Sequence, residues 1–274
     1  MTTTTMTAPR FELADRALRI GAGFWWCSSV LGQWAFFYYI AIFYGPSTLQ
    51  GDFAVWAKNT HLLKGYVAGD TIGNLIFGVH ALLAGIVAFG GALQMLPQIR
   101  RHVPAFHRWN GRIFLVTALG VSVTGLYMVW VRGATINLIG SLTISGNAVL
   151  IIVCAVAAWR AALRRDFTTH RVWALRTYLV ANGQWFFRAG IFAWIMLNQG
   201  PVGLGKNFDG PVVIFWSIGC YALPLLVLEF YLRAKEHGRG RYAVASVLVV
   251  SGLLAALGIF GTYMALWRPV LALN

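Results

Sequence analysis

Charged residues are scarce in this chain, and acidic residues are scarcer still. Only 11% of the 274 residues are charged, and Asp and Glu together number 8. Soluble domains average about 25% charged residues, so this chain lacks the polar surface that a water-exposed globule or a disordered chain needs. So few carboxylates also leave little for paired-carboxylate catalysis or proton pumping, and no HExxH or GxSxG motif occurs.

Cysteine is also rare, and its placement excludes two further classes of protein. Cys27, Cys154 and Cys220 lie in three different apolar segments and form no CxxC pair. A disulfide framework or a thiolate metal site is therefore not expected. The net charge of +14 does not indicate nucleic acid as a partner, because the basic residues lie in short segments between apolar blocks and not in one patch.

Long apolar segments are what the chain has in abundance. Hydrophobic residues make up 58% of it. A bilayer core about 30 Å thick requires about 20 apolar residues in a helix. Seven segments satisfy this requirement: 20–43, 74–97, 113–132, 136–159, 172–197, 212–232 and 243–267. The sequence predicts an all-α, polytopic integral membrane bundle of seven transmembrane helices in the lipid bilayer.

The basic residues predict the orientation of these spans. They gather before span one and in alternate loops, within residues 10–19, 100–112, 160–171 and 233–241. The other loops contain few: Lys58, Lys64, Arg132, Lys206 and Arg268. The positive-inside rule then places the N-terminus in the cytoplasm and the C-terminus outside. The expected organisation is a cytoplasmic segment 1–19, a transmembrane domain 20–267 and a short outer tail 268–274.

The longest loop, residues 45–73, lies on the predicted outer side. It contains Phe53, Trp56 and Tyr66 together with two lysines. Such a segment can form a short helix that lies on the lipid headgroups. It can equally form an ordered cap over the outer end of the bundle.

Ionisable side chains within the apolar segments are the main functional indicators, because they are costly to bury in lipid. Arg176 and Glu229 lie about one turn inside the same end of sequential antiparallel spans. This matched depth predicts a structural ion pair, with a proton-relay role as the alternative.

The fifth predicted span contains polar and aromatic residues at helical spacing: His170, Trp173, Thr177, Gln184 and Arg188. On one continuous helix these residues form a single stripe, which must face the bundle interior or a cavity. Gln184 and Thr177 can instead serve only as hydrogen-bonding contacts between helices.

No acidic residue within a span matches the depth of Arg188. Its guanidinium is expected either to extend to Asp70 or Asp209 near the outer loops, or to bind an exogenous anion. A carboxylate, a phosphate and a porphyrin propionate are the candidate anions. His80, in the second span, lies at a similar depth.

Three histidines are candidate ligands for haem iron. His107 and His170 lie at matched depth at the cytoplasmic interface, and neutral imidazoles from two helices can hold a b-type haem. His80 is a third candidate, because small residues on its side of the helix would admit a flat macrocycle. The alternatives are a hydrogen-bonded core residue for His80 and lipid-phosphate contacts for His107 and His170.

Three motifs together resemble a known family. They are GVHALLAG around His80, HRWNGR within Arg101–Arg112, and DFTTHRVWALRTY followed by WFFR, which ends at Arg188. Over residues 74–190 the chain resembles the bacterial predicted membrane proteins called domain of unknown function 2306. The resemblance implies a multi-pass protein of the bacterial cytoplasmic (inner) membrane without an assigned reaction. It also implies a shared polar set: His80, Arg101, His107, Arg112, His170, Trp173, Arg176 and Arg188. A looser similarity links the histidines at helix ends to di-haem cytochromes of the b561 kind, although no transmembrane histidine lies opposite His80.

The leading hypothesis from the sequence is a redox or electron-transfer component. It would bind b-type haem or quinone through His107 and His170, with His80 and Arg188 as a second polar site. Arg112, Trp173 and Gln184 are further candidate cofactor-binding residues. One alternative is a non-redox carrier or receptor for a small anionic, macrocyclic or lipid-like ligand bound by the stripe of span five. Another is a scaffold subunit of a larger membrane complex.

Overall fold

The computed structural model describes residues 8–58, 64–135 and 137–272, and within these residues it contains helices and no strand. Ten α-helices, one 3-10 helix and one π-helix occur in this part of the chain. In order they are α1 (Ala8–Gln50), η1 (Phe53–Lys58), α2 (Thr71–Gln94), α3 (Pro97–His102), α4 (Pro104–Trp130), α5 (Leu138–Leu163), α6 (Phe167–Ala181), α7 (Gly183–Leu197), α8 (Pro211–His237), α9 (Arg241–Thr262), η2 (Tyr263–Trp267) and α10 (Arg268–Leu271).

Six helices in the described residues are long and apolar enough to cross a membrane: α1, α2, α4, α5, α8, and α9 with η2. The prediction of an all-α bundle with several membrane-spanning helices is confirmed at this level. The helices are longer than the predicted apolar segments, since α1 begins at Ala8 and α4 at Pro104. Hydropathy detects only the lipid-compatible part of a helix, whereas the backbone hydrogen bonds continue into its polar flanks.

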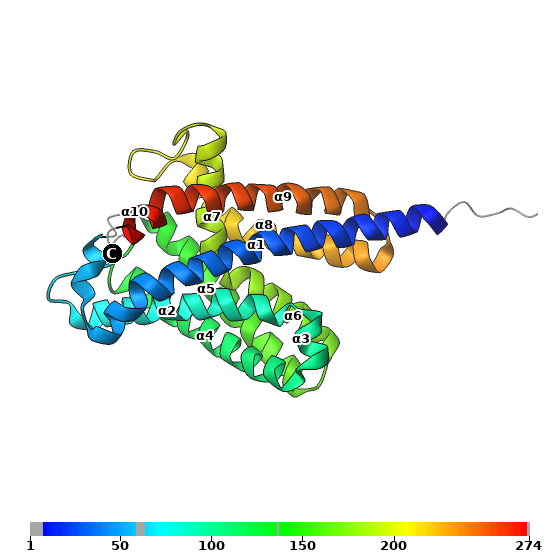
Figure 1. The fold of residues 1–274 in the computed structure, drawn as a ribbon, viewed down its shortest axis with the longest axis horizontal. Helices are drawn as coiled ribbons and strands as arrows, with labels where there is room; N and C mark the ends of the chain where they lie inside the picture. The colour runs from blue at the N-terminus through cyan, green and yellow to red at the C-terminus, as the bar shows by residue number, and fades with distance from the viewer. Residues whose placement is uncertain (1–7, 59–63, 136, 273–274) are drawn as a thin grey trace, which may run out of the picture.

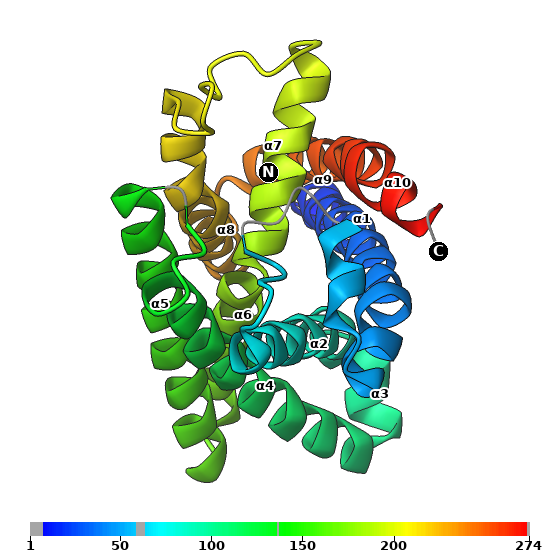
Figure 2. The same cartoon turned by 90° about the vertical axis from the view of Figure 1, so that its left-hand side faces the viewer.

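The fifth predicted span, residues 172–197, is divided into two helices, so the prediction of one continuous helix is wrong here. Helices α6 and α7, of 15 residues each, meet at Asn182. The side-chain amide of Asn182 donates to the carbonyl oxygen of Tyr178 at 2.8 Å, in competition with helical backbone bonds. Gly183 follows and weakens the helix further. Figure 2 shows that α7 leaves the junction in a different direction from α6.

The helices form a closed bundle in which neighbours in sequence are mostly neighbours in space. Helix α2 packs between α1 and α4, and α5 packs against both α4 and α6. Helix α9 closes the arrangement because it packs along α1 on one side and along α7 on the other (Figures 1 and 2). Segments from opposite ends of the chain therefore share one interior.

One end of the bundle collects the basic segments. Asp15 forms an ion pair with Arg241 at 3.2 Å, and Lys235 lies within electrostatic range of Asp15 and Arg171. The beginning of α1, the α5–α6 connection and the α8–α9 connection are thus together. Figure 1 shows the beginning of α1, α3 and the α8–α9 connection at the same end.

The opposite end is closed by an aromatic cluster. Trp56 of η1 is 1% exposed, and its indole N–H donates to Ser47 Oγ at 2.7 Å. Its ring packs against Tyr44 and Phe77. The first described part of the outer loop therefore forms a cap over the bundle. Residues 59–63 of this loop lie outside the described residues.

The predicted outer tail also begins as helix, in α10. Just before it, Trp267 of η2 is buried and stacks on Tyr39 and Phe36 of α1, with ring centroids 5.6 and 5.8 Å apart. The end of the last long helix is therefore anchored to the first. Residues 273–274 of the predicted tail lie outside the described part of the chain.

Candidate functional site

His80 is held in one orientation by a neighbouring helix. Its Nδ1 lies 2.9 Å from Thr124 Oγ1 of α4. The Thr124 hydroxyl donates its own proton to the carbonyl oxygen of Gly120 at 2.7 Å, so it accepts from His80. Nδ1 therefore carries the hydrogen, and Nε2 presents a lone pair.

Arg188 of α7 has little to neutralise it. One guanidinium N–H donates to the carbonyl oxygen of Gln184 at 3.0 Å, and the group lies 5.9 Å from the ring centroid of Phe36. No ion pair with Arg188 occurs among the described residues. A guanidinium has five N–H donors, so most of its hydrogen-bonding capacity is available to a ligand.

His80 and Arg188 lie within electrostatic range of each other, and Tyr39 and Tyr44 of α1 lie within the same range of Arg188. We call Phe36, Tyr39, Tyr44, His80 and Arg188 the inner cationic site. His80 and Arg188 remain partly accessible although α1, α2, α4 and α7 surround them.

Helix α8 fixes the position of α7. Trp216 lies against Gly190, where an added Cβ would collide with its indole ring. The Trp216 N–H donates to the carbonyl oxygens of Phe186 and Phe187 at 3.2 and 3.1 Å. Trp216 of α8 thus holds the turn of α7 that precedes Arg188.

The expected contact between Arg188 and Asp70 does not form. Asp70 pairs with Arg132, whose Nε lies 3.6 Å from Asp70 Oδ2. Asp209 lies against Gly205 in the loop between α7 and α8 and forms no ion pair with Arg188 in the described residues. Of the two expectations for Arg188, an exogenous anion is the one that stays open.

His107 and His170 approach each other at the basic end, within electrostatic range. His170 Nδ1 lies 2.9 Å from the carbonyl oxygen of Ala158, to which it donates, so its Nε2 is the ring nitrogen that is free to accept or ligate. His107 Nδ1 is buried without a hydrogen-bond partner among the described residues. Arg112, on the same helix as His107, stacks on Trp109, with its guanidinium carbon 4.9 Å from the ring centroid.

The remaining residues of the predicted stripe do not share one face with Arg188. Trp173 lines a groove between α5 and α6 and stacks with Arg176 at 4.6 Å. Thr177 is fully buried and donates to the carbonyl oxygen of Trp173. The break at Asn182 changes the helix direction between Thr177 and Gln184, so the stripe is divided into two parts.

Arg176 and Glu229 lie together, with Arg176 Nη2 2.8 Å from Glu229 Oε1. Arg176 Nε donates to the same oxygen at 2.9 Å. Both nitrogens bind one carboxylate oxygen, and Trp173 covers the guanidinium. This arrangement joins α6 to α8 close to the basic end.

The comparisons with known proteins agree with the motifs. Residues 77–206 match the family model described as "Predicted membrane protein (DUF2306)". The resemblance to DUF2306 is confirmed. No curated protein and no solved structure matches the chain.

The DUF2306 region supplies only part of the inner cationic site. His80 and Arg188 lie within it, whereas Phe36, Tyr39 and Tyr44 come from α1, before the region begins. Likewise, Glu229 pairs with Arg176 from outside the region. The polar residues of the DUF2306 region are thus completed by helices on both sides of it.

Sequence reasoning missed three polar features of the interior. Tyr178 donates its hydroxyl proton to Gln33 Oε1 at 2.9 Å, and both side chains are buried. The second is the break between α6 and α7. The Asn182–Gly183 dipeptide, a recognised helix breaker, was the signal for it in the sequence. The third is Arg132, which appeared in sequence as an ordinary loop charge and is 7% exposed.

Proposed function

We propose that this protein crosses a bacterial cytoplasmic membrane seven times, with α6 and α7 together forming one crossing. Their combined length, residues 167–197, exceeds what the hydrocarbon core requires. The grouping of the basic segments at one end supports an N-terminus in the cytoplasm and a C-terminus outside.

We further propose that the protein is a receptor or carrier for a small anionic or lipid-like molecule, which binds at the inner cationic site. The observation that supports this is the guanidinium of Arg188, enclosed by helices and without an acidic partner in the described residues. An isolated charge at membrane depth is costly, and a ligand carboxylate or phosphate would offset that cost with two parallel hydrogen bonds.

The other side chains of the site fit an amphipathic anion. His80 Nε2 can accept a hydrogen bond from a ligand hydroxyl or protonated group, while Phe36 and Tyr39 provide apolar surface for a hydrocarbon part. Trp267 and the aromatic cluster close the outer end above Tyr39. Such a site favours a ligand with one charged end and an apolar body.

Decanoate provides a test, with decanol as its uncharged analogue. At 100 times its Kd, a ligand that binds only the folded state raises the free energy of unfolding by about 2.7 kcal/mol. We expect decanoate, and not decanol, to raise the melting temperature of the detergent-purified protein. Arg188→Gln should abolish this shift, because it removes the charge and keeps most of the side-chain volume.

The matched control is Arg101→Gln, which makes the same charge change on the exposed surface of α3. It should leave the decanoate shift intact. An equal shift in Arg188→Gln and the unmodified protein would rule out the inner cationic site as the place where the anion binds.

A second candidate is the redox function, with haem b or quinone at His107 and His170. His170 and His107 would hold the haem iron, because the Ala158 carbonyl engages His170 Nδ1 and leaves Nε2 to ligate, and His107 Nδ1 has no partner in the described residues. Farther along the His80 side of α2, Phe114 and Tyr178 already fill the position next to Gly91, so a macrocycle has no room on that part of the helix. No group of three or more metal-binding side chains occurs among the described residues.

An absorption spectrum tests this second candidate. If haem binds, protein purified from haem-replete cells shows a Soret band, and both His107→Ala and His170→Ala remove it, whereas His237→Ala at the exposed end of α8 does not. Extraction and chromatography of the same preparation would detect a bound quinone. A colourless, quinone-free preparation would eliminate the redox function.

A further inference from the structure

A groove of about 510 Å³ runs between α5 and α6 towards the basic end of the bundle. Its inner part is apolar and is formed by Val153, Val156 and Ala157 on α5, with Trp173 on α6. Val153 and Val156 are exposed on the outer surface of the bundle, so the groove opens toward lipid. Its shape and composition suit an acyl chain.

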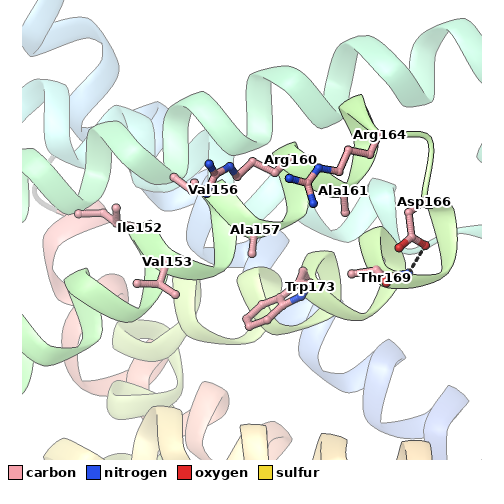
Figure 3. A pocket seen from close by; sticks show the side chains of 10 residues that line it. All are labelled: Ile152, Val153, Val156, Ala157, Arg160, Ala161, Arg164, Asp166, Thr169 and Trp173. Atoms are coloured by element: carbon pink, nitrogen blue, oxygen red, sulfur yellow. Dashed lines mark hydrogen bonds between the residues drawn. The ribbon is translucent and has the colours of Figure 1, made fainter.

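The end of the groove nearest the α5–α6 connection is cationic. Arg160 and Arg164 are one turn apart on α5, and both are exposed. Figure 3 shows both side chains extended along α5, over the groove. Neither forms an ion pair among the described residues.

The one acidic residue of the groove does not neutralise these arginines. Asp166 Oδ1 accepts a hydrogen bond from the backbone N–H of Thr169 at 3.0 Å, as the N-cap of α6 (Figure 3). Hydrogen bonds from the hydroxyl and then from the backbone N–H of Thr169 lower the pKa of the Asp166 carboxyl group below its ordinary value, so the cap persists at neutral pH. Both guanidinium groups remain available to an anion.

From this juxtaposition we infer that the α5–α6 groove binds an anionic glycerophospholipid. The phosphate lies between Arg160 and Arg164, and one acyl chain lies along Val153, Val156 and Trp173. Basic pockets between membrane helices on the cytoplasmic side are recognised by anionic headgroups, and the adjoining apolar channel selects a lipid over a free phosphate. This site is separate from the inner cationic site and does not depend on Arg188.

Photolabelling of the full-length protein in neutral detergent tests the inference. The probes are phosphatidylglycerol and phosphatidylcholine that carry a diazirine in the same acyl chain, and the readout is labelling of peptides within residues 152–173. We expect saturable labelling by phosphatidylglycerol at lower concentration than by phosphatidylcholine. Each surface arginine contributes about fivefold in affinity, so Arg160→Gln with Arg164→Gln should raise the half-saturating concentration about 20- to 30-fold.

Two further variants separate the charge from the groove. Arg100→Gln with Arg101→Gln makes the same charge change on α3, outside the groove, and should leave labelling unchanged. Val153→Trp keeps the charge but obstructs the acyl chain at an exposed position, and should weaken labelling. Equal loss in the two arginine pairs, or full competition by free glycerol 1-phosphate, would overturn the inference.

Discussion

Arg132→Ala should lower the free energy of unfolding by about 1–3 kcal/mol, because two acceptors at the beginning of α2 lose their buried, charged hydrogen-bond donor. The Arg132 guanidinium donates to the carbonyl oxygen of Gly73 and to Asn74 Oδ1, and it faces Asp70. Without the guanidinium, the polar groups at the beginning of α2 lose their common partner.

The arrangement around Arg132 also explains why the effect spreads beyond one contact. Asn74 Oδ1 accepts from the backbone N–H of Val67 at 3.0 Å, and Asn74 Nδ2 donates to the Val67 carbonyl oxygen at 2.8 Å. Lys64 Nζ donates to the carbonyl oxygen of Arg132 at 2.9 Å. The end of α4, the beginning of α2 and the loop before it are therefore joined at one point. A double-mutant cycle of Arg132→Ala with Asn74→Ala should show a coupling energy of about 0.5–3 kcal/mol.

Reversible unfolding in mixed micelles measures these changes. Arg132→Lys should recover only part of the stability, because a lysine keeps the charge but cannot make the forked contacts. Arg268→Ala, at an exposed position in α10, is the control and should change stability by less than about 0.5 kcal/mol. If Arg132→Ala behaves like Arg268→Ala, the buried cluster has no role in stability.

The all-helical architecture with several long apolar helices was the feature most accessible from sequence. A helix in lipid must satisfy its own backbone hydrogen bonds, so long apolar segments have few alternatives to helix. Equal depth along two helices also indicated which charges could approach one another. Arg176 and Glu229, and His80 and Arg188, are close for this reason.

The contacts that complete the sites were not accessible in the same way. The rotation of a helix about its axis depends on packing, so nothing in the sequence assigned Phe36 to Arg188 or Gln33 to Tyr178. The break at Asn182 invalidated the helical spacing on which the single stripe depended. Arg132 was misjudged because a charge at the end of an apolar segment ordinarily faces water, whereas here Lys64 from the loop before α2 and the beginning of α2 lie against it.

Gly258→Ala should separate α7 from α9 and lower the free energy of unfolding by about 1–3 kcal/mol, as overpacking does. A Cβ at Gly258 would collide with the backbone carbonyl of Ala189 on α7. Small residues allow membrane helices to approach this closely. The added Cβ meets the backbone of Ala189, which cannot move away by a change of rotamer. Removing the Ala189 methyl group with Ala189→Gly should therefore not restore stability.

Gly23→Ala is the matched control, since an added Cβ at Gly23 of α1 meets no atom within 4 Å. It should leave stability unchanged or raise it by up to about 1 kcal/mol through better helix propensity. Ala189 follows Arg188 in sequence, so a displaced α7 also moves the guanidinium away from His80 and Phe36. Gly258→Ala should therefore lower the melting temperature and also weaken its increase with decanoate. Gly23→Ala should lower neither quantity. A Gly258→Ala protein that keeps full stability and full decanoate response would show that the α7–α9 contact does not position the inner cationic site.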